Sequence, residues 1–190
     1  MRGFSLSLIA ALPISGAALA QEGLAYDLEL AGHQALSAVQ QTHEPATFKT
    51  DGCSGGMSAA WRVAARLFPS FEDTHGDLPP WEGCCVTHDH AYHAGGQGRS
   101  SQQSYQDRQD ADLELQNCVI EGAKGSLDTL ADAYGLEPDD VIIGYGLIGA
   151  AMYRAVRLGG APCSGLPWRW GYGYPQCIVM PADIKTRDVT

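Results

Sequence analysis

The segment Gly83–Gly96, GCCVTHDHAYHAGG, decides how the rest of this sequence is interpreted. It places two adjacent cysteines just before a His-Asp pair, and two further histidines and a tyrosine follow before the closing glycines. Such a segment fits a catalytic helix held by disulfides, a transition-metal site or a His-rich surface turn. The residues elsewhere in the chain have to distinguish these three alternatives.

On a helix, one face of this segment carries its most reactive side chains. Cys85, His88, Asp89 and Tyr92 are spaced i, i+3, i+4 and i+7, which brings them onto one face, whereas Cys84 points about 100° away. The pattern therefore predicts a helix from about 83 to 94, ended by Gly95-Gly96.

The other two histidines fit a metal site poorly. His90 points largely to the opposite side of such a helix, and His93 lies five positions after His88. Three histidines spread around a helix do not converge as a tetrahedral zinc ion requires. We interpret His90 and His93 as part of a solvated helix face.

The first twenty residues, MRGFSLSLIAALPISGAALA, indicate an export signal. One arginine precedes an apolar run that ends in a small-x-small cleavage pattern, and the run is short for a membrane span. A buried N-terminal helix is the alternative. We expect cleavage after Ala20, a secreted or periplasmic protein, and a single domain over residues 21–190.

Charge and cysteine content narrow the possible partners. The formal charge of the 190-residue chain is −10, and loss of Arg2 with the signal changes it to −11. An acidic chain gains nothing from nucleic-acid phosphates, so cations are the favoured small partners and nucleic acid is excluded. An even number of cysteines in an oxidising compartment predicts disulfides, but six cysteines allow fifteen pairings. They are Cys53, Cys84, Cys85, Cys118, Cys163 and Cys177.

The remaining pattern predicts an all-α fold. Helical spacing of apolar residues runs from 26 to 41 and recurs in the segment MSAAWRVAARLF, and a serine at 100 or 101 can cap a helix that reaches about Ala123. Residues 69–83 are expected to form an exposed loop, and Pro138 fits the first turn of a helix. The apolar stretch after it is too short before Arg154 for a membrane span, which indicates a core helix. Its glycines fit close helix packing or an unwound segment, and the end of the chain is loop-rich.

Two further motifs have a place around His88. In RQDADLELQNCV, Asp112 precedes Cys118 by six residues, so a bond from Cys118 to Cys84 would join two helices and bring Asp112 towards His88. Such a carboxylate would fix the imidazole tautomer. The segment DGCSGG can direct backbone carbonyls at a hard cation, or can be an ordinary turn.

These residues together resemble the secreted phospholipase A2 family. CCVTHDHAY is similar to the family's active-site helix, CCxxHDxCY; DGCSGG resembles its calcium loop, and ADLELQNC its second helix. The two cysteines that form one further disulfide in the family are Ala91 and Ala111 here, and this paired loss supports the alignment. The resemblance covers roughly residues 51–118, with a remodelled link between Cys53 and Cys84, and nothing after Cys118 matches.

The resemblance implies calcium-dependent hydrolysis of the sn-2 ester of glycerophospholipids at a membrane or micelle surface. His88 would be the general base on water, Asp112 would orient it, and Tyr92 would hydrogen-bond Asp112. Asp89 would bind calcium, and the Ser54 N–H would donate to the oxyanion. The implied loop carbonyl ligands of calcium are those of Gly52, Ser54 and Gly56, although Asp51 could offer its own carboxylate.

Two other functional classes remain open from the sequence. One is a catalytically silent binding module or toxin on the same scaffold, and the other is an exported protein whose His-rich helix binds zinc or copper. An aromatic group near the C-terminus could seat the protein at a lipid interface or pack on the core. It comprises Trp168, Trp170, Tyr172 and Tyr174.

The resemblance also implies a disulfide pattern that can be tested directly. Cys84–Cys118 and Cys53–Cys85 should be bonded, which leaves Cys163–Cys177, and each bond should add roughly 2–4 kcal/mol to the free energy of unfolding. Peptide mapping of the unreduced protein should recover these three pairs. A peptide that links Cys53 to Cys84 would refute the alignment.

Overall fold

The computed structural model describes residues 15–53, 57–96 and 100–180. Within these ranges the chain forms α-helices joined by loops and has no β-strand, which confirms the all-α prediction. The helices are α1 (Ser15–Gln40), α2 (Met57–Leu67), α3 (Pro69–His75), α4 (Glu82–Ala94), α5 (Ser101–Gly125), α6 (Leu127–Tyr134) and α7 (Pro138–Gly159).

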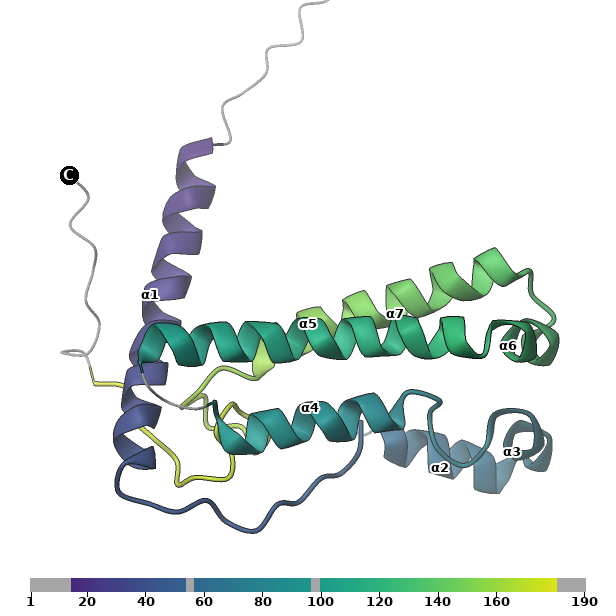
Figure 1. The fold of residues 1–190 in the computed structure, drawn as a ribbon, viewed down its shortest axis with the longest axis horizontal. Coiled ribbons are helices and arrows are strands. Elements are labelled where there is room, and N and C mark those ends of the chain that lie inside the picture. Colours follow the sequence, from purple (N-terminus) through teal and green to yellow (C-terminus); the bar gives the residue numbers. More distant parts are fainter. Residues whose placement is uncertain (1–14, 54–56, 97–99, 181–190) are drawn as a thin grey trace, which may run out of the picture.

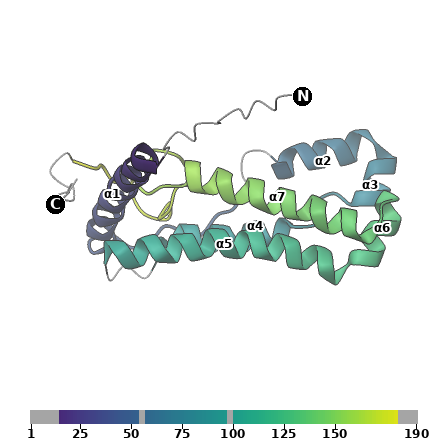
Figure 2. The same cartoon turned by 90° about the horizontal axis from the view of Figure 1, so that it is seen from above.

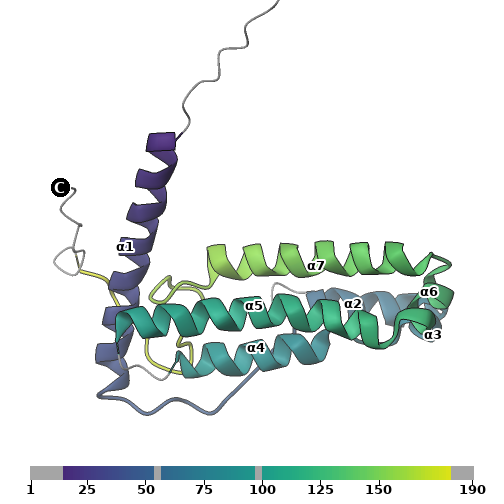
Figure 3. The ribbon, with the colours of Figure 1, turned by 45° about the horizontal axis from the view of Figure 1, so that its top comes forward.

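The arrangement is an antiparallel group of long helices crossed by α1 at one end. Figures 1 and 3 show α5 between α4 and α7, with α6 turning the chain from α5 into α7. Figure 2 shows the same helices from above, with α2 and α3 at the end where α6 lies and α1 at the opposite end. The predicted antiparallel helix pair is therefore α4 and α5.

Local sequence signals fix the ends of this pair. The Ser100 side chain accepts a hydrogen bond from the Gln103 N–H, so α5 has an N-cap of the kind that the sequence predicted. Gly95 ends α4 in a left-handed conformation with φ of 68°, where its N–H donates to the Ala91 carbonyl. A Cβ at Gly95 would also lie 2.7 Å from the Gly171 Cα, so glycine lets the C-terminal segment approach α4.

One prediction about local structure was wrong. The segment after Phe68 was expected to be a loop, but Pro69 begins the short helix α3. Proline is tolerated in the first turn because its missing N–H would have no intrahelical partner there.

The predicted first helix exists but is longer than expected: α1 begins at Ser15 and continues through the expected cleavage position after Ala20. Residues 1–14 of the predicted signal lie outside the described residues.

Helix α7 buries only one of its faces, whereas the sequence predicted a core helix. Val141, Tyr145 and Gly149 are its buried residues, and a Cβ at Gly149 would lie 3.0 Å from the Gln116 carbonyl of α5. Close packing therefore explains this glycine. The opposite face exposes Ile143 and Leu147, which retain 60% and 69% of their accessible surface. By length and composition alone α7 could cross a membrane, and only 17% of its most apolar window is buried.

A partly buried polar junction holds α1 against α5 and α7. Glu29 on α1 accepts hydrogen bonds from Arg108 of α5 and from Arg157 of α7, the latter at 3.1 and 3.2 Å. Arg108, fully buried, also donates to the Val156 carbonyl at 2.7 Å near the end of α7. Because one carboxylate lies between two guanidinium groups from different helices, the crossing of α1 is electrostatically specified.

His33 lies on α1 one turn after Glu29 and has no exposed surface. Its Nδ1 is 2.8 Å from the Ser104 hydroxyl, which also accepts from the Trp170 indole N–H at 3.0 Å. Burial lowers the pKa of His33 below its usual value, although the neighbouring Glu29 carboxylate opposes this and Arg108 and Arg157 reinforce it. Burial alone would raise the pKa of Glu29, but His33 and the two arginines lower it overall.

The burial of His33 predicts acid sensitivity of the fold. The unfolded chain takes up a proton on this imidazole near pH 6.5, whereas the folded chain does so only at lower pH, so the free energy of unfolding should fall as pH drops below about 7. Urea unfolding at pH 7.5 and pH 5.5 should show a decline of up to about 1.4 kcal/mol per pH unit from this group.

The variant His33→Gln, which keeps a polar side chain beside Ser104, should reduce that decline. The control His90→Gln removes an exposed imidazole and should retain the decline of the unsubstituted protein. If His33→Gln kept the full difference between the two pH values, another group would be responsible for it.

Candidate active site

The predicted reactive face of α4 exists and points inward. Cys85, His88, Asp89 and Tyr92 are all buried, with exposed fractions between 2% and 8%. Their i, i+3, i+4, i+7 spacing places them on the side of the helix that packs against neighbouring elements. The common face that the sequence predicted is therefore confirmed.

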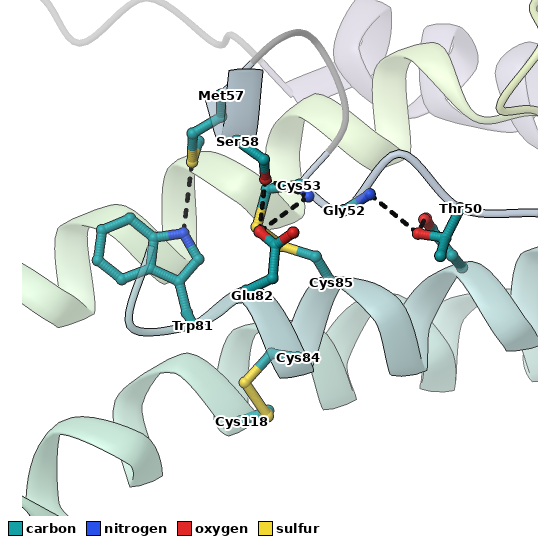
Figure 4. The surroundings of a disulfide bond; sticks show 11 residues. Thr50, Gly52, Cys53, Met57, Ser58, Trp81, Glu82, Cys84, Cys85 and Cys118 are labelled. Atoms are coloured by element: carbon teal, nitrogen blue, oxygen red, sulfur yellow. Dashed lines mark hydrogen bonds between the residues drawn. A yellow bond between two sulfur atoms is a disulfide. The ribbon is translucent and has the colours of Figure 1, made fainter. Parts of the chain in front are cut away.

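Two disulfides fix the position of this face (Figure 4). Cys84–Cys118 joins α4 to α5 with a Cα–Cα distance of 5.7 Å, and Cys53–Cys85 joins α4 to the preceding loop with a distance of 5.0 Å. The third pair is Cys163–Cys177 in the C-terminal segment. All three predicted pairings are confirmed.

A small cavity lies between α4 and α5 where the resemblance placed the paired cysteine loss. It measures about 40 Å³, and both Ala91 and Ala111 line it together with the Cys84–Cys118 disulfide. The two alanines thus lie against one common space in the helix pair.

His88 and Asp112 form a buried hydrogen-bonded pair between the two helices. His88 Nε2 is 2.8 Å from Asp112 Oδ1, and Asp112 has no exposed surface. A carboxylate accepts hydrogen bonds, so Nε2 carries the proton and Nδ1 of the neutral ring is left as the acceptor. The contact between these two residues, predicted from the sequence, is confirmed.

Asp112 has further donors that hold it in place. The Tyr92 hydroxyl donates to Oδ1 at 2.7 Å, as predicted, and Arg157 Nη1 donates to Oδ2 at 3.1 Å. Burial raises the pKa of Tyr92 well above its usual value, and the Asp112 carboxylate adds to this, so the phenol stays protonated and remains a donor. Arg157 was not predicted, because it lies in the part of the sequence that the resemblance does not cover.

Asp89 faces the loop that precedes α2. Thr50 Oγ1 donates to Asp89 Oδ2 at 2.6 Å, and the Gly52 N–H donates to Thr50 Oγ1 at 2.9 Å. Burial raises the pKa of Asp89, and the charges of Asp51 and Glu82 contribute, although the hydrogen bond from Thr50 and the charge of His88 oppose this. A desolvated carboxylate beside other carboxylates is one that a bound cation would stabilise.

Glu82, which was not among the predicted site residues, hydrogen-bonds to one residue within the predicted calcium loop and to another just after it (Figure 4). Its Oε2 accepts from the Ser58 hydroxyl at 2.5 Å and from the Cys53 N–H at 3.4 Å. Gly52 is buried with φ of 79°, and a Cβ there would lie 2.0 Å from Glu82 Oε1. The left-handed conformation favours glycine at this point, and a Cβ would also force the Glu82 side chain to shift.

The predicted loop ligands are only partly observed. Gly52 lies next to the Asp89 face through Thr50, whereas Ser54 and Gly56 lie outside the described residues. Among the described residues, no group of three or more His, Cys, Asp or Glu side chains is arranged to hold a metal ion. The Asp89 carboxylate supplies oxygen, the type of ligand atom that calcium prefers.

An apolar pocket adjoins His88 and Asp89. Its volume is about 120 Å³, and it lies between α4, the loop at Cys53, α5 and the end of α7. The pocket therefore brings the imidazole next to a surface suited to hydrocarbon. Its lining comprises Gly52, Cys53, Met57, Cys85, His88, Asp89, Tyr92, Leu115, Met152, Ala155, Val156, Gly160 and Trp168.

The remaining predicted residues separate into surface and core. His90 is exposed and stacks on Phe48 with ring centroids 3.5 Å apart, but His93 is partly buried against Tyr172, which corrects the view that both form a solvated face. Of the C-terminal aromatics, Trp170 is buried in the core with 1% of its surface exposed, whereas Trp168 retains 41%.

Comparisons of the chain with protein-family models, with curated proteins and with solved structures found no match.

Proposed function

We propose that this protein is a calcium-dependent ester hydrolase of the phospholipase A2 type, which cleaves the sn-2 ester of glycerophospholipids. The observation that carries the proposal is the buried His88–Asp112 hydrogen bond at 2.8 Å, formed between two disulfide-linked antiparallel helices beside an apolar pocket. The common cavity at Ala91 and Ala111 supports the same alignment. This combination is more specific than any one motif in the sequence.

In this mechanism His88 activates water without a covalent intermediate. Nδ1 of the neutral imidazole accepts a proton from the attacking water as its oxygen bonds to the ester carbon. Asp112 stabilises the imidazolium that forms, and the proton then passes to the departing glyceryl oxygen as the ester C–O bond breaks. The products are a fatty acid and a lysophospholipid.

Arg157 and Tyr92 act through Asp112. Their hydrogen bonds to Oδ2 and Oδ1 fix the carboxylate, so that the imidazole keeps one orientation and one tautomer. The apolar pocket next to His88 would receive the part of the acyl chain nearest the ester. The roles of Tyr92 and Arg157 therefore use only hydrogen bonds that both side chains already make to Asp112.

Asp89 and the carbonyl of Gly52 would hold calcium, together with Ser54 and Gly56 from the loop. When bound, the ion supplies positive charge that polarises the ester carbonyl and attracts the phosphate. The raised pKa of Asp89, caused by burial and by Asp51 and Glu82, fits a carboxylate whose counter-charge comes from a ligand.

The disulfides also indicate the cellular compartment in which the protein works. Three of them in 190 residues are typical of an oxidising environment outside the cytosol. Together with the N-terminal segment they support export, with the mature protein periplasmic or secreted. Cleavage after Ala20 would leave Glu29 and His33, the residues that fix α1, in the mature chain.

The first test is fatty-acid release from phosphatidylcholine vesicles. EDTA should abolish it and calcium, not zinc, should restore it. His88→Ala should lower the rate by at least about 100-fold, because the general base is lost. The matched control His90→Ala, on the exposed side of the same helix, should keep the activity.

Release that persists in His88→Ala would rule out this mechanism. A folded protein that binds vesicles without releasing fatty acid would identify a silent binding module, and activity or binding that depends on zinc would identify the alternative metal protein.

A second test concerns how the enzyme meets its substrate surface. Ile143, Leu147 and Leu158 lie exposed along α7, whose other side lines the apolar pocket through Met152 and Val156. An acidic protein needs apolar groups to bind a lipid surface. Ile143→Ser/Leu147→Ser should therefore lower the rate on vesicles by about tenfold or more, since each residue would lose apolar burial in the lipid.

The rate of this variant on a monomeric short-chain phospholipid should stay unchanged. The pair Val63→Ser/Leu67→Ser, which removes comparable exposed side chains from α2, is the control and should retain vesicle activity. Equal losses in both pairs would show that α7 is not a specific contact surface.

A further inference from the structure

A second pocket opens beside the apolar one and has a different chemical character. Its volume is about 370 Å³, and it shares Asp89 and Trp168 with the apolar pocket. Lys49, Thr50, Asp51, Pro167 and Tyr172 complete its lining. We call this space the aromatic-acidic pocket. Because the two pockets meet at Asp89 and Trp168, one ligand with an apolar and a polar part could occupy both.

The lining charges favour a cation. Asp51, Asp89 and Lys49 all line this pocket, so the formal charge of its lining is −1. If calcium occupied Asp89 and bound a phosphodiester, the positive ion would already be matched by Asp89 and the phosphate. Asp51 and Lys49 would then be the charged lining residues next to whatever group extends beyond the phosphate, and their formal charges cancel.

The two aromatic rings add a second kind of recognition. The Tyr172 hydroxyl donates to the Lys49 carbonyl at 2.7 Å, and its ring packs edge-to-face on His93 with centroids 5.2 Å apart, so this ring is fixed. Trp168 lies in the same C-terminal segment and is 41% exposed. Burial raises the pKa of Tyr172, and the charges of Asp89 and Asp51 raise it further, which places both carboxylates near this phenol.

Aromatic faces beside carboxylates suit one class of cation in particular. A quaternary ammonium group has no N–H to donate, so it gains little from hydrogen-bond acceptors and is recognised by ring faces and by negative charge. A primary ammonium can be held by carboxylates alone. The presence of Trp168 and Tyr172 in this lining therefore favours the quaternary group.

We propose that the aromatic-acidic pocket binds the trimethylammonium of a phosphocholine head group, so that choline phospholipids are the preferred substrates. This inference rests on the proposed lipase function, and it adds the head group that the enzyme selects. The acyl chain occupies the apolar pocket, the ester lies at His88, and the head group extends past Asp89 to Trp168 and Tyr172. Trp168, which lines both pockets, separates the two parts of the lipid.

The test uses short-chain phospholipids below their aggregation concentration, so that attraction to a charged surface plays no part. Choline, ethanolamine and glycerol lipids with identical acyl chains are compared by kcat/KM in saturating calcium. The choline lipid should exceed the other two by about tenfold, a size typical of a partly desolvated cation–ring contact.

Variants at Trp168 separate recognition from packing. Trp168→Leu should reduce the preference for choline to about twofold or less, and Trp168→Phe, which keeps a ring face, should retain most of it. The ratio between head groups is the readout because a change in the apolar pocket would alter all three lipids equally.

Calorimetric titration with phosphocholine provides a readout that needs no catalysis. The protein should bind phosphocholine at least about fivefold more tightly than phosphoglycerol, and Tyr172→Leu should remove this difference. Equal kcat/KM for choline and ethanolamine lipids, or a choline preference that survives Trp168→Leu, would overturn the inference. If no lipid were hydrolysed, the proposed function would fail. The titration alone would then show whether the aromatic-acidic pocket binds phosphocholine.

Discussion

The carboxylate of Asp112 is the point on which the rest of the structure depends. Three side chains from two other helices bind it: His88 and Tyr92 from α4 and Arg157 from α7. A buried carboxylate with no exposed surface is costly unless it is paired and hydrogen-bonded, so this contact constrains where α4, α5 and α7 can lie. Arg157 in turn pairs with Glu29, which extends the same constraint to α1. The geometry of the candidate site and the crossing of the helices are therefore one network.

This network explains why much of the site could be predicted and part of it could not. The positions of Cys85, His88, Asp89 and Tyr92 follow from helical periodicity. The resemblance over residues 51–118 implies two of the disulfide pairs, and the third is the pair that remains. Arg157 follows from neither, because it is 45 residues from Asp112 in a helix whose sequence suggests only apolar packing. Glu29 was missed for the same reason: nothing local in α1 distinguishes a carboxylate that pairs with two arginines of other helices from one that faces water.

The fold shows a similar division between local and long-range causes. Helices with clear starts, such as the one capped by Ser100, were predicted well because the cap forms within a few residues. Pro69 was misread because the same residue can end one helix or begin the next, and the choice depends on the surrounding packing. The apolar stretch of α7 likewise does not reveal that only one of its faces is covered, since coverage is decided by α5.

The charges around the site are compensated in two different ways. Asp112 and Glu29 are matched by Arg108 and Arg157 from the protein itself. Among the described residues, by contrast, neither Asp89 nor Glu82 forms an ion pair with a lysine or arginine, and burial together with the neighbouring carboxylates raises the pKa of Asp89. The protein thus neutralises the Asp112 carboxylate that holds His88, but the described residues give the neighbouring Asp89 no fixed counter-charge. This arrangement keeps the imidazole oriented and favours a positive charge that arrives with a ligand. That asymmetry is the strongest physical reason to expect a cation at Asp89.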